Sequence, residues 1–396
     1  MVLDVTRGFA ILGILLMNIQ SFSMIGQAYM NPTAYGDLTG LNKWTWIVSH
    51  VIADQKFMSI FSMLFGASII MITKGAEQKN QSSLRVHYSR NFWLLIIGLF
   101  HAYLVWHGDI LTPYAICAFL LYPLRKLAVN KLLIAGVFVF SISSIGDLWM
   151  GFSLVNWPEE AVQKLSGSWD PSHEQIDREV NAFLGDFSSQ LMQRAKIARM
   201  MQTTFFLTHY LWRISGLMLI GMALFKSGFL TGKLQARVYR RVLVYVGLTG
   251  ISLVIFGVIR NFRADWSLEY SMFLGGQYNY WGSLGMALAY ISGLNLICHY
   301  GRLKPLTGGL AAIGRTALSN YIMQSFICTS IFYGFGIGLF GQVERVYQLL
   351  ITFGIWLLQF HFSRIWIKYF RYGPFEWVWR SLTYGKIHRP NSRYPE

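Results

Sequence analysis

Residues 7–27, RGFAILGILLMNIQSFSMIGQ, decide the fold class of this chain. After Arg7 the stretch carries no charged side chain and is long enough for one membrane crossing, because a transmembrane helix needs about 20 mostly apolar residues. It also lacks the small-residue cleavage motif of a signal peptide. We therefore expect it to stay in the membrane as the first span.

The composition extends this interpretation to the whole chain. Of the 396 residues, 54% are hydrophobic and only 13% are charged, and the mean hydropathy is +0.40, which excludes an ordinary soluble domain. The pattern predicts an all-α polytopic membrane helix bundle of about ten transmembrane helices, with split or re-entrant helices in the longer runs. The approximate spans are 7–27, 45–73, 91–107, 110–124, 132–152, 205–225, 241–258, 270–298, 306–335 and 346–367.

Basic residues set the predicted orientation. They gather at 74–90, 125–131, 226–241, 302–304 and in the tail from Arg364 to Arg393. Lys and Arg accumulate on the cytoplasmic side of membrane proteins, so both termini are predicted to be cytoplasmic. The net charge of +16 is spread over these turns, where it faces anionic lipid. We therefore expect the lipid bilayer, and no nucleic acid, as the partner of this charge.

The polarity of the chain suggests three parts. Residues 1–153 form an N-terminal bundle of about five spans, and 204–396 form a C-terminal bundle of about five spans with a basic tail. Between them, 154–203 is a polar, partly helical connector on the outer side, acting as a lid or as a structural cap. The three cysteines lie in apolar runs without ligand spacing, so neither a metal nor a permanently bound cofactor is expected.

Several motifs resemble one family. LDVTRGFAILGILLMNIQSF at the start, FSMLFG at 61–66, GLFHAYLVWHGDIL at 98–111, GRTALSNYIMQS, FYGFGIGLFG and GPFEWVWRSLTYGK occur in the order found in the DUF418, or YeiB-like, bacterial membrane proteins. The resemblance covers nearly the whole chain, and 217–386 matches the named domain. It implies a bacterial inner (cytoplasmic) membrane location. It also implies kinship with transmembrane acyltransferases, which move an acyl group from a cytoplasmic thioester such as acetyl-CoA to an acceptor on the far side.

The catalytic histidine of those relatives does not carry over. Acyltransferase-3 proteins are similar around Arg7 and Gly8 but have a histidine eleven positions after the arginine, where this chain has Asn18. Heparan-glucosaminide-type enzymes also have Asn there and use a histidine in the loop that follows. Here no histidine occurs between Asn18 and Trp46. Asn18 cannot act as a base and is expected only to line the substrate path.

Ionisable residues within the spans are the candidate site, since burying them in a membrane is costly. His101 and Asp109 would lie on one helical face about 12 Å apart, bridged by water or substrate, unless Gly108 breaks the helix and folds Asp109 back. We expect His101 to be a general base oriented by Asp109 or Asp54, or a proton relay; a structural histidine is the alternative. His107 lines the substrate path or is merely solvated.

Three arginines are candidates for binding the phosphates of an acyl-CoA donor: Arg7, Arg315 and Arg213. Arg315 lies near the cytoplasmic start of its span; the alternative for Arg213 and Arg315 is an ion pair with a buried aspartate. A polar stripe at helical spacing either lines the cavity or packs helices, and consists of Asn320, Tyr321, Gln324 and Ser325.

Two functions follow. The first is a transmembrane acyltransferase-like enzyme, with an acyl-CoA donor substrate and an envelope acceptor. The second is a transporter or exporter that uses the same buried His, Asp and Arg residues as a path. A non-catalytic membrane partner of an envelope assembly is a weaker third, and the sequence leaves a homo-oligomer open.

Overall fold

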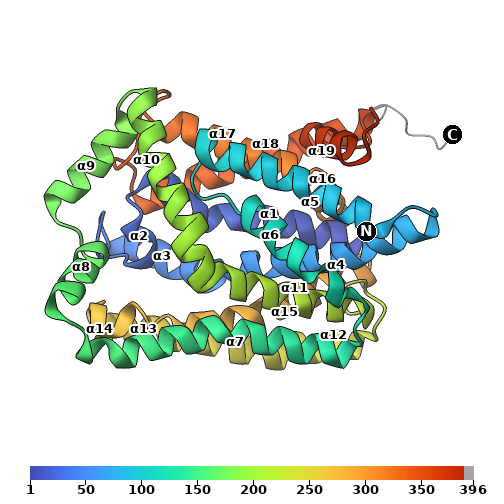
Figure 1. Cartoon of the computed structure of the whole chain (residues 1–396), viewed down its shortest axis with the longest axis horizontal. Helices are drawn as coiled ribbons and strands as arrows, with labels where there is room; N and C mark the ends of the chain where they lie inside the picture. The colour runs from blue at the N-terminus through green and yellow to red at the C-terminus, as the bar shows by residue number, and fades with distance from the viewer. Residues whose placement is uncertain (388–396) are drawn as a thin grey trace.

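The computed structural model describes residues 1–387, and all the regular secondary structure in this range is helical (Figure 1). The first helices are α1 (Val2–Ser23), α2 (Gln27–Met30), α3 (Gly40–Ile52), α4 (Lys56–Gln78), α5 (Ser83–Phe100), α6 (Leu111–Leu121) and α7 (Val129–Ser153). The next are α8 (Glu159–Trp169), α9 (His173–Leu184), α10 (Phe187–Met200), α11 (Leu211–Lys226), α12 (Ala236–Arg241), α13 (Gly247–Arg263) and α14 (Leu268–Ser271). The last are α15 (Gln277–His299), α16 (Lys304–Arg315), α17 (Ala317–Phe332), α18 (Arg345–Tyr369) and α19 (Pro374–Tyr384).

The predicted polytopic helical membrane fold is confirmed. In the described part of the chain, six helical stretches are long and apolar enough to cross a membrane: Val2–Ser23, Gly40–Gln78, Val129–Asn156, Ala236–Arg263, Gln277–His299 and Arg345–Tyr369. The remaining predicted runs are also helical but are shorter or interrupted. The run 306–335, for example, is split at Thr316 into α16 and α17. The total of about ten spans therefore stays a prediction.

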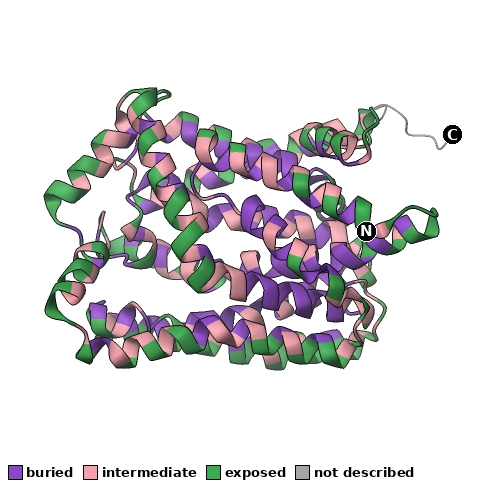
Figure 2. Ribbon diagram, viewed as in Figure 1, coloured by how far each residue is buried: buried purple, intermediate pink, exposed green. Residues whose placement is uncertain are grey.

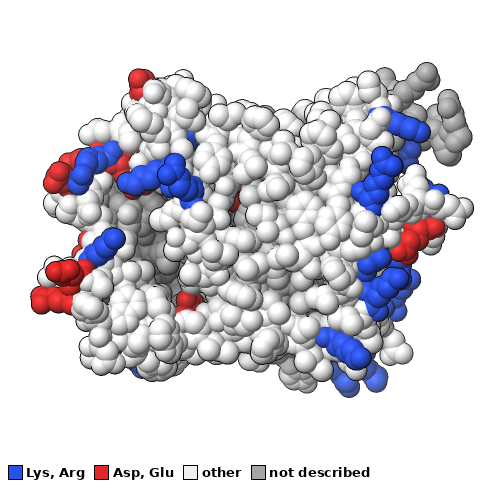
Figure 3. Space-filling view, viewed as in Figure 1, with Lys and Arg blue, Asp and Glu red and all other residues white. Residues whose placement is uncertain are grey.

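Charge divides the molecule into two ends. The N-terminus and α19 lie at the same end of the bundle, on the right in Figure 1. The visible charges at this end are mainly Lys and Arg, whereas the opposite end carries both signs and the belt between them is almost uncharged (Figure 3). This distribution is what a bilayer selects. Arg389 and Arg393 of the basic tail lie outside the described residues.

The predicted connector 154–203 contains α8, α9 and α10, at the end opposite the N-terminus (Figure 1). α9 begins with a capping box, in which the Ser172 side chain accepts from the Gln175 amide and the Gln175 side chain accepts from the Ser172 amide. The connector is not uniformly exposed, because each of its three helices buries part of one face (Figure 2). Trp169, Phe183 and Arg194 are among its buried side chains.

Glycines let the central helices approach each other closely. Four of them form two helix crossings: Gly8 and Gly314 between α1 and α16, and Gly66 and Gly221 between α4 and α11. A methyl group on Gly8 would stand 1.9 Å from the Leu310 carbonyl oxygen, so only hydrogen fits there. Small residues are the usual means of such contacts between membrane helices. The crossings place α1 and α4 at the centre of the bundle.

Candidate functional site

The α-helical geometry of α5 ends directly before His101, and the chain leaves the helix at Trp106. α5 passes into a π-helical turn, His101–Val105, and Trp106 adopts extended φ/ψ angles of −153° and 128°. Gly108 is required here because a methyl group on it would stand 2.3 Å from the Trp106 ring. The loop folds Asp109 back toward His101, so of the two predicted arrangements the broken helix is the one observed. π-Helical turns of this kind occur frequently at functional sites.

Asp109, His101 and Ser325 form a continuous hydrogen-bonded chain, which we call the Ser-His-Asp chain. His101 Nδ1 lies 2.9 Å from Asp109 Oδ1, and His101 Nε2 lies 2.8 Å from Ser325 Oγ. All three residues are buried. A carboxylate cannot donate, so Nδ1 carries the proton toward Asp109 and Nε2 of the neutral ring accepts from the Ser325 hydroxyl. This arrangement can accept a proton from a serine that acts as a nucleophile.

Two further contacts hold Asp109 in place. Its second oxygen, Oδ2, accepts from the Thr112 amide at 2.8 Å, at the start of α6. The Tyr321 hydroxyl accepts from the Ile110 amide at 3.2 Å and donates to the Gly108 carbonyl at 3.4 Å. The Tyr321 ring also lies 5.0 Å from the His101 ring. The predicted lining residue Tyr321 is therefore a support of the Asp109 loop.

His107 does not join the chain. It is buried beneath the connector, with its ring centroid 5.8 Å from that of Phe183, so the solvated alternative is wrong. The neighbouring Trp106 ring stacks on the Phe22 ring, with the ring centroids 3.9 Å apart. Both His107 Nδ1 and Trp106 Nε1 are buried, and no hydrogen-bond partner for either occurs in the described part of the chain.

Asp54 belongs to a different set of residues, the Lys-Asp cluster of His50, Asp54, Lys56 and Asn279. Asp54 accepts from the Asn279 side chain at 2.7 Å and from the Tyr29 hydroxyl at 2.9 Å. Lys56 Nζ donates to the His50 carbonyl at 2.9 Å and to Asn279 Oδ1 at 2.5 Å. The carboxylate that orients His101 is thus Asp109, and the structure does not bring Asp54 to it.

The three predicted phosphate-binding arginines are not together. Arg7 contacts Asp4 at 3.1 Å and the Gly314 carbonyl at 3.3 Å, next to Arg315, which is exposed at the end of α16. Arg213 is instead buried between helices, where it donates to Ser59 at 3.1 Å and Ser283 at 2.9 Å. Of these three arginines, Arg7 and Arg315 lie at the basic end of the molecule and Arg213 does not.

The rest of the polar stripe packs helices. Asn320 donates to Ser363 at 2.9 Å, and Gln324 donates to the Ile11 carbonyl at 3.1 Å and to Gln359 at 2.9 Å. These bonds tie α17 to α1 and α18. Asn18, half-buried on α1, is not part of them.

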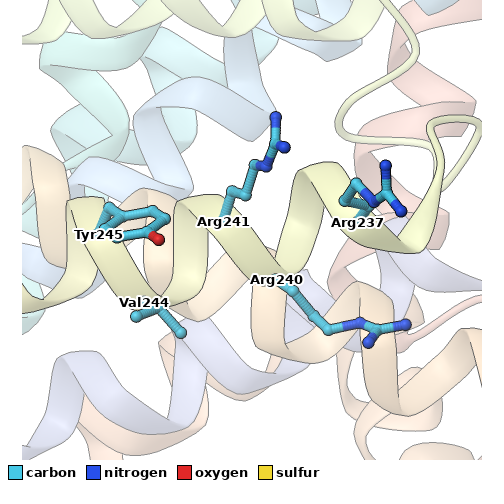
Figure 4. A pocket seen from close by; sticks show the side chains of 5 residues that line it. All are labelled: Arg237, Arg240, Arg241, Val244 and Tyr245. Carbon is cyan, nitrogen blue, oxygen red and sulfur yellow. The ribbon is translucent and has the colours of Figure 1, made fainter.

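Another polar feature lies at the basic end, on α12 and the π-helical turn Val242–Val246 that follows it. An open hollow of about 370 Å³ is lined by Arg237, Arg240, Arg241, Val244 and Tyr245 (Figure 4). The three guanidinium groups point in different directions in Figure 4, so they do not converge on one anion. Within residues 1–387, no three His, Cys, Asp or Glu side chains are grouped so that they could hold a metal ion.

Sequence reasoning gave no role to two residues. The predicted polar stripe assigns Ser325 only to cavity lining or helix packing, although this serine follows Tyr321 by one helical turn on the face toward His101. Arg194 was not singled out at all. The available signal was spacing, because Gln190, Arg194 and Ala198 form one buried stripe of α10 that includes polar side chains.

Comparisons with known proteins agree with the full-length resemblance. The family model described as a protein of unknown function, DUF418, matches residues 224–386. The chain is 32% identical over 394 residues to the uncharacterised protein YeiB of Escherichia coli strain K12, covering 96% of this chain and 95% of that protein. It is 30% identical over 399 residues to the uncharacterised protein YxaH of Bacillus subtilis strain 168, covering 97% and 94%. No solved structure matches the chain.

Proposed function

Because this chain belongs to the DUF418 family of multi-span membrane proteins, with full-length bacterial relatives, we propose that it is a transmembrane acyltransferase of the bacterial cytoplasmic membrane. In this proposal the basic end faces the cytoplasm and an acyl-CoA is the donor. The observation that carries the proposal is the Ser-His-Asp chain, with its two buried hydrogen bonds of 2.8 and 2.9 Å. A serine, a histidine base and an orienting carboxylate in this order recur in acyl transfer on unrelated folds.

The first half-reaction acylates the enzyme. Ser325 Oγ attacks the thioester carbonyl carbon while Nε2 of His101 takes the hydroxyl proton. The carbon–sulfur bond then breaks, and the leaving CoA thiolate takes that proton from His101. Asp109 stays ionised and stabilises the imidazolium through Nδ1. The product is an acyl ester on Ser325 and free CoA.

The second half-reaction delivers the acyl group. A hydroxyl or amine of the acceptor attacks the ester carbonyl and gives its proton to His101 Nε2. The bond between the acyl carbon and Ser325 Oγ breaks, and the serine oxygen recovers the proton from His101. Atoms and charges balance without an oxidant or a metal. In this proposal the acceptor approaches from the side of the bundle opposite the donor.

The donor is proposed to enter at the basic end. Arg7 and Arg315 flank the Gly314 crossing there and suit the phosphates of CoA. Ser325 follows Ala317, the first residue of α17, by eight positions, or about 12 Å along a helix. To reach Ser325, the thioester therefore has to enter the bundle by about 12 Å from the basic end.

Transport is the second candidate, favoured by buried charge within two predicted spans: Asp54 and Lys56 in 45–73, and Arg213 in 205–225. It predicts uptake into sealed vesicles that follows a pH gradient. It does not require the Ser325 hydroxyl, so covalent chemistry at this residue separates the two functions.

The test is capture of the acyl-enzyme. Detergent-purified protein is incubated with alkynyl acyl-CoA, and the labelled peptide is identified by mass spectrometry. We expect a hydroxylamine-labile adduct on Ser325 that is absent from Ser325→Ala. Ser330→Ala is the matched control, because Ser330 is an exposed serine of the same helix. Labelling that persists in Ser325→Ala, or no labelling of the intact protein, would refute the proposal.

A further inference from the structure

Arg194 of α10 is a buried cation for which residues 1–387 provide no hydrogen-bond acceptor. Its side chain has no solvent exposure, yet Nε, Nη1 and Nη2 all lack a hydrogen-bond acceptor. Among the described residues, no Asp or Glu oxygen forms an ion pair with it within 4.0 Å. The Phe187 ring lies 5.4 Å from its guanidinium carbon.

Its surroundings contain further polar groups without partners. Arg194 lies in electrostatic range of His107 and Tyr333, and burial lowers the pKa of its guanidinium. His107 Nδ1, Trp106 Nε1 and the Tyr333 hydroxyl are buried and unpaired as well. We call these four residues the Arg194 site. Phe183 joins its two sides, with ring centroids 5.8 Å from His107 and 4.9 Å from Tyr333.

Leaving this site empty is energetically unfavourable. An unpaired charge buried among aromatic rings is strongly disfavoured, because it loses hydration and gains no counter-charge. Water satisfies individual N–H groups but does not neutralise the guanidinium. An oxyanion does both, since a carboxylate or phosphate matches the planar donors of arginine in a bidentate geometry. The tyrosine hydroxyl and the indole N–H add donors for the same anion.

The site is next to the Ser-His-Asp chain. The Trp106 ring lies 6.3 Å from the His101 ring and 5.9 Å from the His107 ring. Trp106 therefore belongs to the Arg194 site and at the same time faces the His101 ring. Arg194 is supplied by the connector, at the end of the molecule opposite the basic face (Figure 1).

From these contacts we infer that Arg194 binds an oxyanion, a carboxylate or phosphate group, of the molecule that receives the acyl group. Naming that molecule as the acceptor rests on the proposed function, whereas the anion site does not. Binding at Arg194 would hold the acceptor beside Ser325, on the side away from the donor. The connector is then a working part of the site rather than a structural cap.

The experiment measures thermal stability of the whole protein in an uncharged maltoside detergent. Inorganic phosphate, glycerophosphoglycerol and glucuronate are titrated against chloride at constant ionic strength. At about ten times its Kd, a bound anion should raise the Tm by roughly 2 °C. A larger shift with glycerophosphoglycerol indicates a lipid headgroup, and a larger shift with glucuronate indicates a sugar acid.

Four variants decide the result. Arg194→Gln should lose the shift, whereas Arg199→Gln, an exposed arginine of the same helix, should keep it. Ser325→Ala should also keep it, so a failure of the anion site and a failure of the acyl-transfer proposal are distinguishable. In the absence of anion, Arg194→Leu should have a higher Tm than the unchanged protein, because the unpaired charge is gone. Equal shifts with and without Arg194, or no shift in the unchanged protein, overturn the inference.

Discussion

The Ser-His-Asp chain and the Lys-Asp cluster contain similar ionisable groups but end differently. In the Lys-Asp cluster, Lys56 and Asp54 are joined through the two ends of one amide, Asn279, and every bond closes on another structural group. In the Ser-His-Asp chain the last member, Ser325, carries a hydroxyl whose proton the histidine can take. Buried charge alone therefore does not identify a reactive site. A reactive site is identified by the group at the end of its hydrogen-bonded chain.

Removing the hydroxyl or the base tests this contrast most severely. Ser325→Ala and His101→Ala should each lower the rate of acyl labelling by about 10³-fold or more, since nucleophile and base act as a unit. The measurement is the initial rate of label incorporation from alkynyl acyl-CoA. A double variant that is no slower than either single one would support the unit. Labelling of His101→Ala at the normal rate would remove the histidine from the mechanism.

Changing the orienting carboxylate should have the next largest effect. Asp109→Asn keeps the size of the side chain but removes the charge that fixes the proton on Nδ1, so we expect labelling to slow by about 10²- to 10⁴-fold. Because the variant can still pack, its Tm should change little. Asp54→Asn is the matched comparison in the other cluster and should label at the normal rate. Equal losses in both variants would erase the distinction between the two regions.

The Lys-Asp cluster should respond in stability instead. Asn279→Leu leaves the carboxylate of Asp54 and the ammonium of Lys56 without their shared partner, and unsatisfied buried groups of this kind cost about 1–3 kcal/mol each. We expect a lower Tm with labelling unchanged at temperatures where the variant is folded. Scanning thermal denaturation beside the labelling assay reports both quantities. A loss of labelling with no loss of stability would assign chemistry to this cluster.

His87, a buried histidine before the third predicted span, should show the smallest effect. Its Nε2 lies 3.0 Å from the Ala118 carbonyl, and burial lowers its pKa to about 4. Below pH 6.5 the His87 ring takes up a proton in the unfolded chain but stays neutral in the folded protein. This contribution to stability is therefore present above pH 6.5 and is lost as the pH falls. Between pH 7 and pH 6 the free energy of unfolding falls by about 0.7 kcal/mol. His87→Gln keeps the donor and should flatten this dependence in Tm; an unchanged slope would contradict it.

The fold class was predictable because apolar length and basic turns are local features of the sequence. His101 and Asp109 were also predictable, as ionisable residues within an apolar run. Their direct contact was only one of two alternatives, since it depends on the π-helical turn and on Trp106 filling the space beside Gly108. The pairing with Ser325 joins positions 224 residues apart, which spacing within one helix cannot reveal. Arg194 was missed because a basic residue in a polar connector resembles a solvated one.

The glycine crossings have a consequence for motion. Helices in backbone contact, such as α1 with α16 at Gly8 and α4 with α11 at Gly66, cannot slide past each other without steric collision. Each pair must therefore move as one rigid body. Substrate entry then falls to the elements that lack such crossings, and α10 lies directly over the π-helical turn of His101. We therefore expect any opening of the site to involve this helix, in a movement of the microsecond-to-millisecond kind, while the paired helices stay together.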